Sequence, residues 1–166
     1  MKTSLALFAL TAALVAVPSA ANAQVAAGNP CAEGARVDSA QSPVRTWVLC
    51  STNPGRGAMD KELWSTVDGV NFKEHGFAPR KAITAGFAAG SDSLLAIAGS
   101  AADQCVVFVS ANGGDTWDER LTVTDGAPAA NLQFTDATHG SVTCGFEKPV
   151  TYVTVDAGRT WTAQPN

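Results

Sequence analysis

Apolar residues in this chain gather in short runs that are separated by turn-forming residues. Clear examples are Leu94–Ala98, Val106–Val109 and Val150–Val153. Several runs are apolar at consecutive positions, as expected for strands that are covered on both faces. Glycine, asparagine, aspartate and serine stand between them and favour turns. No amphipathic helix is visible after the N-terminal residues, so the pattern predicts an all-β fold.

One turn pattern recurs at an equal spacing of 44 residues, measured between Asp68, Asn112 and Asp156. Its form is Ser/Thr-x-Asp/Asn-x-Gly-x-Thr-Trp, and each copy follows a short apolar strand. In the first copy the glycine stands one place early, and Asn71-Phe72 replace Thr-Trp. The residues assigned to these three corners are Ser65, Asp68 and Gly69; Ser110, Asn112, Gly114, Thr116 and Trp117; and Thr154, Asp156, Gly158, Thr160 and Trp161.

These residue types suit the turn of a β-hairpin. An aspartate or asparagine side chain accepts hydrogen bonds from nearby backbone N–H groups and closes the turn. Glycine adopts positive φ at little steric cost, and the tryptophan buries a large apolar face as the next strand begins. A second apolar hairpin precedes each corner, so each unit has the size of one propeller blade. We expect three four-stranded antiparallel blade-like repeats, a partial β-propeller, in units of about 34–77, 81–121 and 129–164.

The three corners resemble the Asp-box, or BNR, repeat of sialidases, sortilin-type receptors and photosystem II assembly factors. The phrase Phe134–Gly140, followed by a strand and a corner, is similar to blades of the assembly-factor type. The resemblance covers about residues 34–164 and implies propeller blades, but it does not imply an activity. Propellers usually have four to eight blades. Three units therefore favour a monomeric or loosely associating arc, with a homodimer that completes a six-bladed ring as the alternative.

The N-terminus has the pattern of a secretory signal in residues 1–23. Lys2 precedes the apolar run Leu5–Val17, and Ala21-Asn22-Ala23 form a small-residue cleavage site. Cleavage after Ala23 leaves residues 24–166, which is the size of a single domain. The sequence therefore predicts a secreted or periplasmic protein.

The four cysteines are all in the predicted mature part. An even count in an oxidising compartment predicts two disulfides, and three connectivities are open. We favour Cys31–Cys50 with Cys105–Cys144, because these bridges close the shorter loops. No CxxC pair is present, and His75 and His139 lie far from any two-ligand spacing, so neither a metal nor a cofactor is expected.

Charge and composition narrow the class of partner. The formal net charge of −4 does not suit a nucleic-acid binder, whose affinity rests on Lys and Arg. After the signal, no apolar stretch reaches the roughly 20 residues that a membrane helix needs, so no membrane insertion is expected. With 46% hydrophobic and 16% charged residues, the chain is expected to fold rather than stay disordered.

A sialidase-like enzyme is the sharpest catalytic alternative. The resemblance implies an arginine cluster, a tyrosine nucleophile assisted by glutamate, and an aspartate acid/base. The Phe/Tyr-Arg-Ile-Pro signature of that family is missing, and the arginines share no common position in the units. The single tyrosine, Tyr152, stands at a strand position that is expected to pack in every unit. Catalysis is therefore not expected.

The sequence thus favours an exported, non-catalytic β-propeller-like module that presents loops to an unidentified protein or glycan. The candidate contact surface is the longest irregular loop, Ser51–Lys61, because long loops on rigid scaffolds often carry function. Two alternatives stay open: a sialidase-like glycosidase fragment or subunit, and a periplasmic assembly factor of the photosystem type.

Overall fold

The computed structural model describes residues 28–55 and 58–164, so the predicted signal segment 1–23 lies outside the described residues. The described chain is all-β and forms three four-stranded antiparallel sheets. In the described part, no helix is long and apolar enough to span a bilayer. The strands are β1 (Arg36–Gln41), β2 (Thr46–Gly55), β3 (Ala58–Thr66), β4 (Lys73–Phe77), β5 (Ile83–Ala89), β6 (Leu95–Ala101), β7 (Gln104–Ser110), β8 (Asp118–Val123), β9 (Ala129–Phe134), β10 (Gly140–Cys144), β11 (Val150–Thr154) and β12 (Thr162–Ala163).

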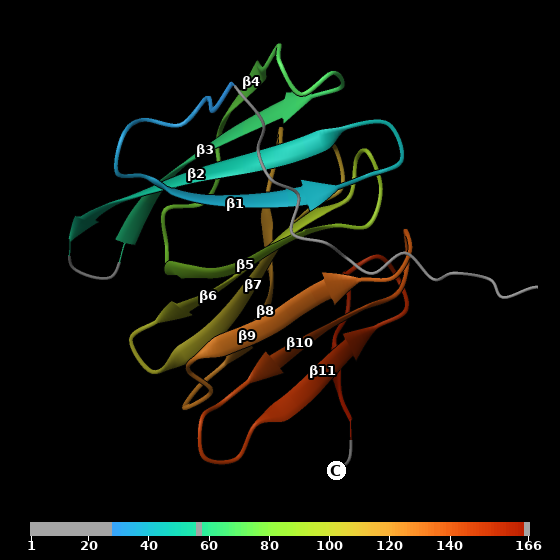
Figure 1. The fold of residues 1–166 in the computed structure, drawn as a ribbon. Helices are drawn as coiled ribbons and strands as arrows, with labels where there is room; N and C mark the ends of the chain where they lie inside the picture. The colour runs from blue at the N-terminus through green and yellow to red at the C-terminus, as the bar shows by residue number, and fades with distance from the viewer. Residues whose placement is uncertain (1–27, 56–57, 165–166) are drawn as a thin grey trace, which may run out of the picture.

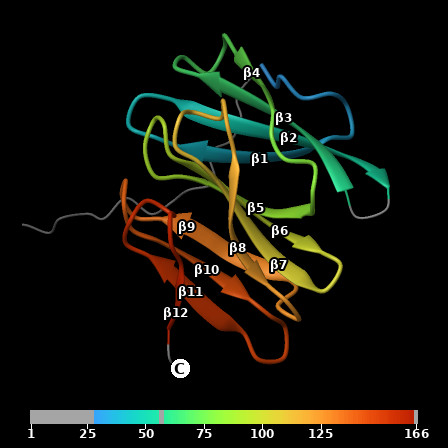
Figure 2. The same ribbon diagram turned by 180° about the vertical axis from the view of Figure 1, so that it is seen from behind.

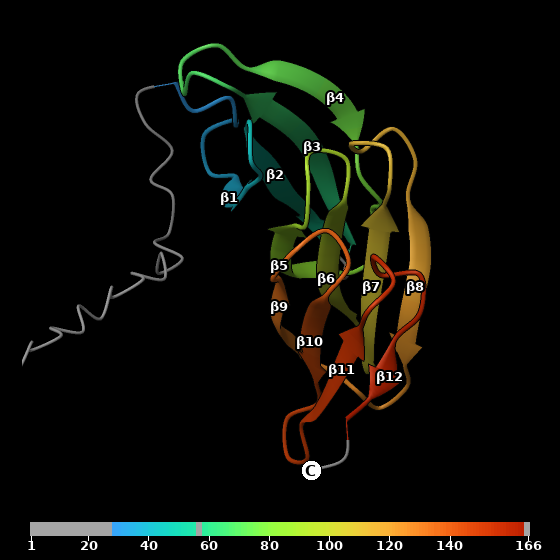
Figure 3. The same cartoon turned by 90° about the vertical axis from the view of Figure 1, so that its right-hand side faces the viewer.

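Each sheet is a simple meander, with orders β1-β2-β3-β4, β5-β6-β7-β8 and β9-β10-β11-β12. The three sheets follow one another through the molecule in chain order (Figure 1). Seen from behind, β8 stands between the first and third sheets (Figure 2). In the side view, β1, β5 and β9 line one side of the stack, while β4, β8 and β12 line the other (Figure 3). The expected three four-stranded antiparallel units are therefore confirmed.

The inner strands describe an arc rather than a ring. β5 packs against both β1 and β9, which places the second unit between the other two. The described residues show no closure of a propeller. Two sheet faces therefore have no neighbouring sheet, one at each end of the arc.

Two cores hold the three sheets together. Between the first and second sheets, Trp47, Leu49 and Leu63 pack with Leu95 and Ile97. All five side chains are almost completely removed from water. Burial of apolar area on this scale is the main favourable contribution to folding.

The core between the second and third sheets is built from smaller side chains. Ala96, Ala98 and Val107 of the second sheet meet Val142 and Cys144 of the third. Partly buried aromatic residues close its edge. Because neighbouring residues of a strand point to opposite faces, Leu95 and Ile97 face the first sheet while Ala96 and Ala98 face the third. This explains why the β6 sequence is apolar without alternation.

Two disulfides support the arc, with the pairing that the sequence favours. Cys105–Cys144 links β7 to β10 across the core between the second and third sheets. Cys31–Cys50 ties the segment that precedes β1 to β2 of the first sheet. Two disulfides indicate an oxidising compartment.

The segment Ser51–Lys61 differs from the sequence prediction. It is not an irregular loop, because β2 and β3 extend into it and pair Ser51 with Lys61 and Thr52 with Asp60. Residues 56–57 lie outside the described part. Met59 and Lys61 are buried, since alternate residues of this hairpin point toward the linker to the second unit.

Candidate functional site

The third corner shows how these turns are closed. The Thr154 hydroxyl donates to the Asp156 carboxylate at 2.8 Å and accepts from the Gly158 N–H at 2.9 Å. The same carboxylate accepts from the Thr160 N–H at 2.9 Å and from the Thr160 hydroxyl at 2.7 Å. The Trp161 indole N–H donates to the Gly158 carbonyl at 3.2 Å. The polar side chains of the corner therefore satisfy the backbone of the turn itself.

The second corner repeats this arrangement with asparagine. The Ser110 hydroxyl donates to the Asn112 carbonyl oxygen at 3.0 Å and accepts from the Gly114 N–H at 2.8 Å. Asn112 accepts from the Thr116 N–H at 3.0 Å, and its amide donates to the Thr116 hydroxyl at 2.9 Å. An uncharged amide thus closes the same turn.

The first corner is one residue shorter and uses a different hydroxyl from the one assigned. Thr66, rather than Ser65, donates to Asp68 at 3.0 Å and accepts from the Gly69 N–H at 2.9 Å. Asp68 accepts from the Asn71 N–H at 2.8 Å and from the Asn71 amide at 2.6 Å. Gly69 and Asn71 therefore take the roles that glycine and threonine have in the other two corners. Each stands one place earlier in the sequence than its counterpart. The spacing of 44 residues between Thr66 and Ser110 carried this signal in the sequence.

The corner carboxylates are held in their ionised form. The Asn71 N–H holds the pKa of Asp68 well below its usual range, with help from the Asn71 amide. The Thr160 hydroxyl and N–H lower the pKa of Asp156 to about 2. Hydrogen bonds to a carboxylate favour its charged form. A carboxylate of this kind is a poor proton donor near neutral pH, which fits a structural role.

The tryptophans of the second and third corners are half-buried rather than fully buried. Trp161 meets the ring of Phe134 edge-on, with centroids 6.2 Å apart. Trp117 packs beside Val106 and Phe108. Its indole N–H is buried and has no hydrogen-bond partner. These rings cover the edges of the cores between sheets.

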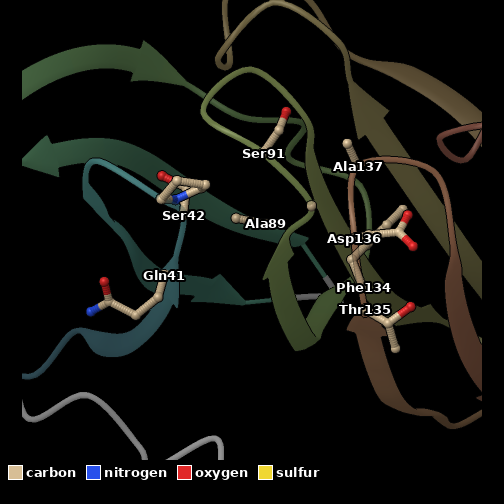
Figure 4. Close-up of a pocket in the computed structure, with 10 residues that line it drawn as sticks. Gln41, Ser42, Ala89, Ser91, Phe134, Thr135, Asp136 and Ala137 are labelled. Carbon is tan, nitrogen blue, oxygen red and sulfur yellow. The ribbon is translucent and has the colours of Figure 1, made fainter. Parts of the chain in front are cut away.

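An open pocket of about 520 Å³ forms where the turns of three inner hairpins converge (Figure 4). One turn comes from each unit: β1–β2, β5–β6 and β9–β10. Ala89 and Phe134 supply apolar surface, and the labelled polar side chains point in several directions around it. The lining residues are Gln41, Ser42, Pro43, Ala89, Gly90, Ser91, Phe134, Thr135, Asp136 and Ala137.

Polar side chains at the pocket hold its turns in place, either within one turn or between two turns. The Asp136 carboxylate accepts from the N–H groups of Thr138 and His139 at 2.7 and 2.8 Å and is hydrogen-bonded to Nδ1 of the His139 ring at 2.8 Å. The Thr138 N–H is the main reason that the pKa of Asp136 lies well below its usual range. The Ser42 hydroxyl bonds to the Asp92 carboxylate, which joins the first turn to the second. The rim is therefore pre-organised.

A second polar cluster lies beside the β1–β2 turn, and sequence reasoning missed it. The Arg45 guanidinium carbon lies 5.4 Å from the ring centroid of Trp47, and the His75 ring lies 4.8 Å from the same indole. His75 Nε2 is 2.8 Å from the Ser65 hydroxyl in a hydrogen bond. Because neighbouring residues of a strand point to opposite faces, the sequence Arg45-Thr46-Trp47 already places Arg45 and Trp47 on one face of the sheet. The sequence does not show that His75 joins them, because that contact depends on how the strands pack.

Lys61 is a buried cation that no motif indicated. Its ammonium donates to the carbonyl oxygens of Pro79 and Ala82 at 2.7 and 2.9 Å, and those of Arg80 and Lys81 lie at 3.4 and 3.3 Å. Burial lowers the pKa of Lys61 to about 8, while the charge of Asp60 raises it. The ammonium is thus held by the linker between the first and second units.

The residues that a sialidase-like site would need are not gathered in the described structure. Tyr152 packs at the edge of the core between the second and third sheets. Arg36 donates to the Thr84 carbonyl at 2.6 Å, Arg80 pairs with Asp60, and Arg120 pairs with Asp118. Within residues 28–55 and 58–164, no group of three metal-ligating side chains converges.

Comparison with known proteins adds no assignment. No protein-family model matches this chain, and no curated protein matches it at a significant level of similarity.

Proposed function

We propose that this chain is an exported, non-catalytic binding or assembly module of the Asp-box type. Its rigid arc presents the turns of the three inner hairpins to a protein or glycan partner. The predicted signal segment and the two disulfides support export to a periplasm or to the outside of the cell.

The observation that carries the proposal is the convergence of one turn from each unit on a single open pocket. Concave sites with mixed apolar and polar lining, formed where several elements meet, are the usual place for a ligand. Loops on a rigid scaffold commonly bind partners. Here the scaffold is fixed by closed corners, two cores and two disulfides.

The polar chemistry at the pocket supports binding rather than proton transfer. Asp136 is committed to its own turn and stays ionised, so it is unsuited to donate a proton near neutral pH. Ser42 is bonded to Asp92, which leaves its hydroxyl as part of the rim. These groups fix the shape of the pocket for a partner.

Filling the pocket tests the proposal. Ala137 is an exposed turn residue of the lining, so Ala137→Trp should fold normally while its indole occupies part of the pocket. The matched control is Ala111→Trp, an exposed turn residue of the second corner that does not line the pocket. Immobilised wild-type protein and both variants are exposed to a glycan array and to a library of exported proteins.

The expected result is a ligand that the wild-type protein and Ala111→Trp retain equally. Ala137→Trp should weaken its binding by about tenfold or more, as expected for the loss of a central contact. Equal retention by all three proteins would place the contact surface elsewhere. Absence of any ligand from both collections would count against a binding module for proteins or glycans.

A further inference from the structure

The Arg45 side chain is partly buried against an aromatic ring, but one of its hydrogen-bond donors has no partner in the described structure. Its guanidinium lies over the Trp47 ring at 5.4 Å, and Trp47 is almost fully buried. A cation over an indole face is electrostatically favourable and holds the side chain in place. The guanidinium is therefore fixed before any ligand arrives.

The chain's own acceptors leave one donor of this guanidinium, its Nε–H, without a hydrogen bond. Arg45 Nε is buried and has no hydrogen-bond partner. The nearest carboxylate oxygen, from Asp92, lies 3.9 Å from Nε, beyond hydrogen-bond distance, and that carboxylate is bonded to Ser42. A buried donor without a partner is unfavourable, so most buried donors in folded proteins have a hydrogen bond.

A histidine and a lysine lie near Arg45, on a protein of net charge −4. His75 contacts the same indole at 4.8 Å, and Lys73 lies two residues before it on β4. Burial lowers the pKa of His75, and Lys73 and Arg45 lower it further, while Asp115 raises it. Lys73, Arg45 and Asp115 are therefore near enough to act on His75.

We infer that Arg45, on its Trp47 platform beside His75 and Lys73, is a binding site for a carboxylate group of a ligand. A planar carboxylate matches the fork of a guanidinium, which can donate two parallel hydrogen bonds to it. The Arg45 side chain is 31% exposed, so solvent reaches part of it even though its Nε is buried. Arg45, His75 and Lys73 are not among the residues that line the pocket of the three turns, and the inference does not depend on that pocket being occupied.

A carboxylate fits better than a doubly charged phosphate. Asp92 lies 3.9 Å from Arg45 Nε, and Asp115 acts on His75 from the second corner. These two carboxylates offset part of the local positive charge, and His75 is held toward its neutral form. A single negative charge therefore balances the site, whereas a second one would be repelled by the two aspartates.

The test is a titration of the ¹⁵N-labelled, disulfide-bonded protein, observed by NMR at the Arg45 Nε–H and the His75 ring. Sodium acetate is the probe, with sodium phosphate and sodium chloride at matched ionic strength. Acetate should shift both signals saturably and should raise the pKa of His75, because a bound anion stabilises the charged imidazole. Chloride should do neither.

Variants separate a built site from a general anion effect. Arg45→Gln should weaken acetate binding, read at His75, by about tenfold or more, since hydrogen bonds to charged groups are strong. Arg120→Gln, which removes an arginine on β8 that is paired with Asp118, should bind as the wild type does. Asp92→Asn should bind acetate more tightly, because a competing carboxylate is lost while an acceptor for Ser42 remains.

Several results would overturn the inference. Shifts that follow ionic strength alone, or that persist in Arg45→Gln, would show an adventitious ion only. Tighter binding of phosphate than of acetate would refute the choice of a carboxylate. If acetate leaves the Arg45 Nε–H unchanged in the wild type and in Asp92→Asn, the guanidinium is not a ligand site. None of these results bears on the pocket variant Ala137→Trp.

Glucuronate and N-acetylglycine then distinguish the two sources of a carboxylate, an acidic sugar and a peptide C-terminus. Tighter binding of either than of acetate supports the inference and identifies the source. Weaker binding of both would contradict it, because a ligand that carries the group should fit at least as well as the group alone.

Discussion

The first and third sheets end the arc in opposite ways. In the first sheet, Val48 and Cys50 are buried on the face away from the second sheet. The segment before β1 is tied there by Cys31–Cys50, and Gly28 lies against the Phe72 ring. In the third sheet, the free face carries Ser141, Thr143, Thr151 and Val153, all partly exposed.

Strand pairing makes these positions directly comparable. Thr46 pairs with Thr66 in the first unit, Leu95 with Ser110 in the second and Gly140 with Thr154 in the third. The pairing register makes three pairs of residues equivalent. Trp47 and Leu49 of the first sheet face the second sheet, and Ala96 and Ala98 of the second sheet face the third. Ser141 and Thr143 hold the same positions in the third sheet, on its free face.

The comparison teaches that the two end sheets protect their outer faces in different ways. Terminal repeats of a stacked array need a polar outer face to stay soluble. The third unit supplies such a face with hydroxyl side chains. The first unit keeps an apolar face and covers it with a disulfide-bound segment of its own chain.

The largest expected effect comes from placing a charge at equivalent positions of the two sheets. Leu49→Asp buries an unpaired carboxylate in the first core and should destabilise the fold by more than about 4 kcal/mol. Thr143→Asp, on the free face of the third sheet, should change stability by less than about 0.5 kcal/mol. Urea unfolding of both variants measures the difference, and similar losses would show that the third face is covered.

Removing a disulfide should have the next largest effect. Cys31→Ser with Cys50→Ser opens a bridge of separation 19 and should lower the unfolding free energy by about 3 kcal/mol. The matched pair Cys105→Ser with Cys144→Ser, of separation 39, should lose about 4 kcal/mol. An unchanged midpoint for the first pair would mean that the tether is not needed to cover the first sheet.

A smaller effect should separate two corner glycines. A Cβ at Gly114 would lie 2.1 Å from Leu63 Cδ2, whereas nothing lies within 4 Å of a Cβ at Gly69, and both residues have positive φ. Gly114→Ala should cost about 2–4 kcal/mol from backbone strain and crowding. Gly69→Ala should cost only about 1–2 kcal/mol from strain. Equal thermal shifts would show that the second corner is not seated on the first sheet.

Acid should weaken the corners that contain aspartate. Asp156 has a pKa of about 2 in the folded chain and a higher value when unfolded. Its stabilising contribution is therefore complete above about pH 4 and is lost as the pH falls toward 2. Asp156→Asn should flatten this loss in urea unfolding followed against pH, because Asn112 closes the equivalent corner without titrating. An unchanged slope would exclude Asp156 as a source of the pH dependence.

The smallest effect, no change in solution mass, is expected from a substitution on the free face of the third sheet. If the polar face ends the arc, the wild-type protein has the mass of one chain in light scattering, and Thr151→Asp leaves that mass unchanged. A mass of two chains that Thr151→Asp reduces to one would instead support the homodimer that completes a six-bladed ring.

The sequence determined the class and number of the units. The equal spacing of Asp68, Asn112 and Asp156, together with short apolar runs, was enough to predict three four-stranded sheets, because turn closure and strand burial are local properties. The sequence also shows hydroxyls at Ser141 and Thr143, but only the pairing register of the structure places them on the free face of the third sheet.

Only the tertiary structure decided how distant parts meet. It brought one turn from each unit to a shared pocket, and it packed Arg45 and His75 against Trp47. It also turned Lys61 inward, against the expectation of an exposed loop. Those arrangements depend on how whole sheets stack on one another, and stacking is set by the shapes of both partner faces rather than by any segment alone.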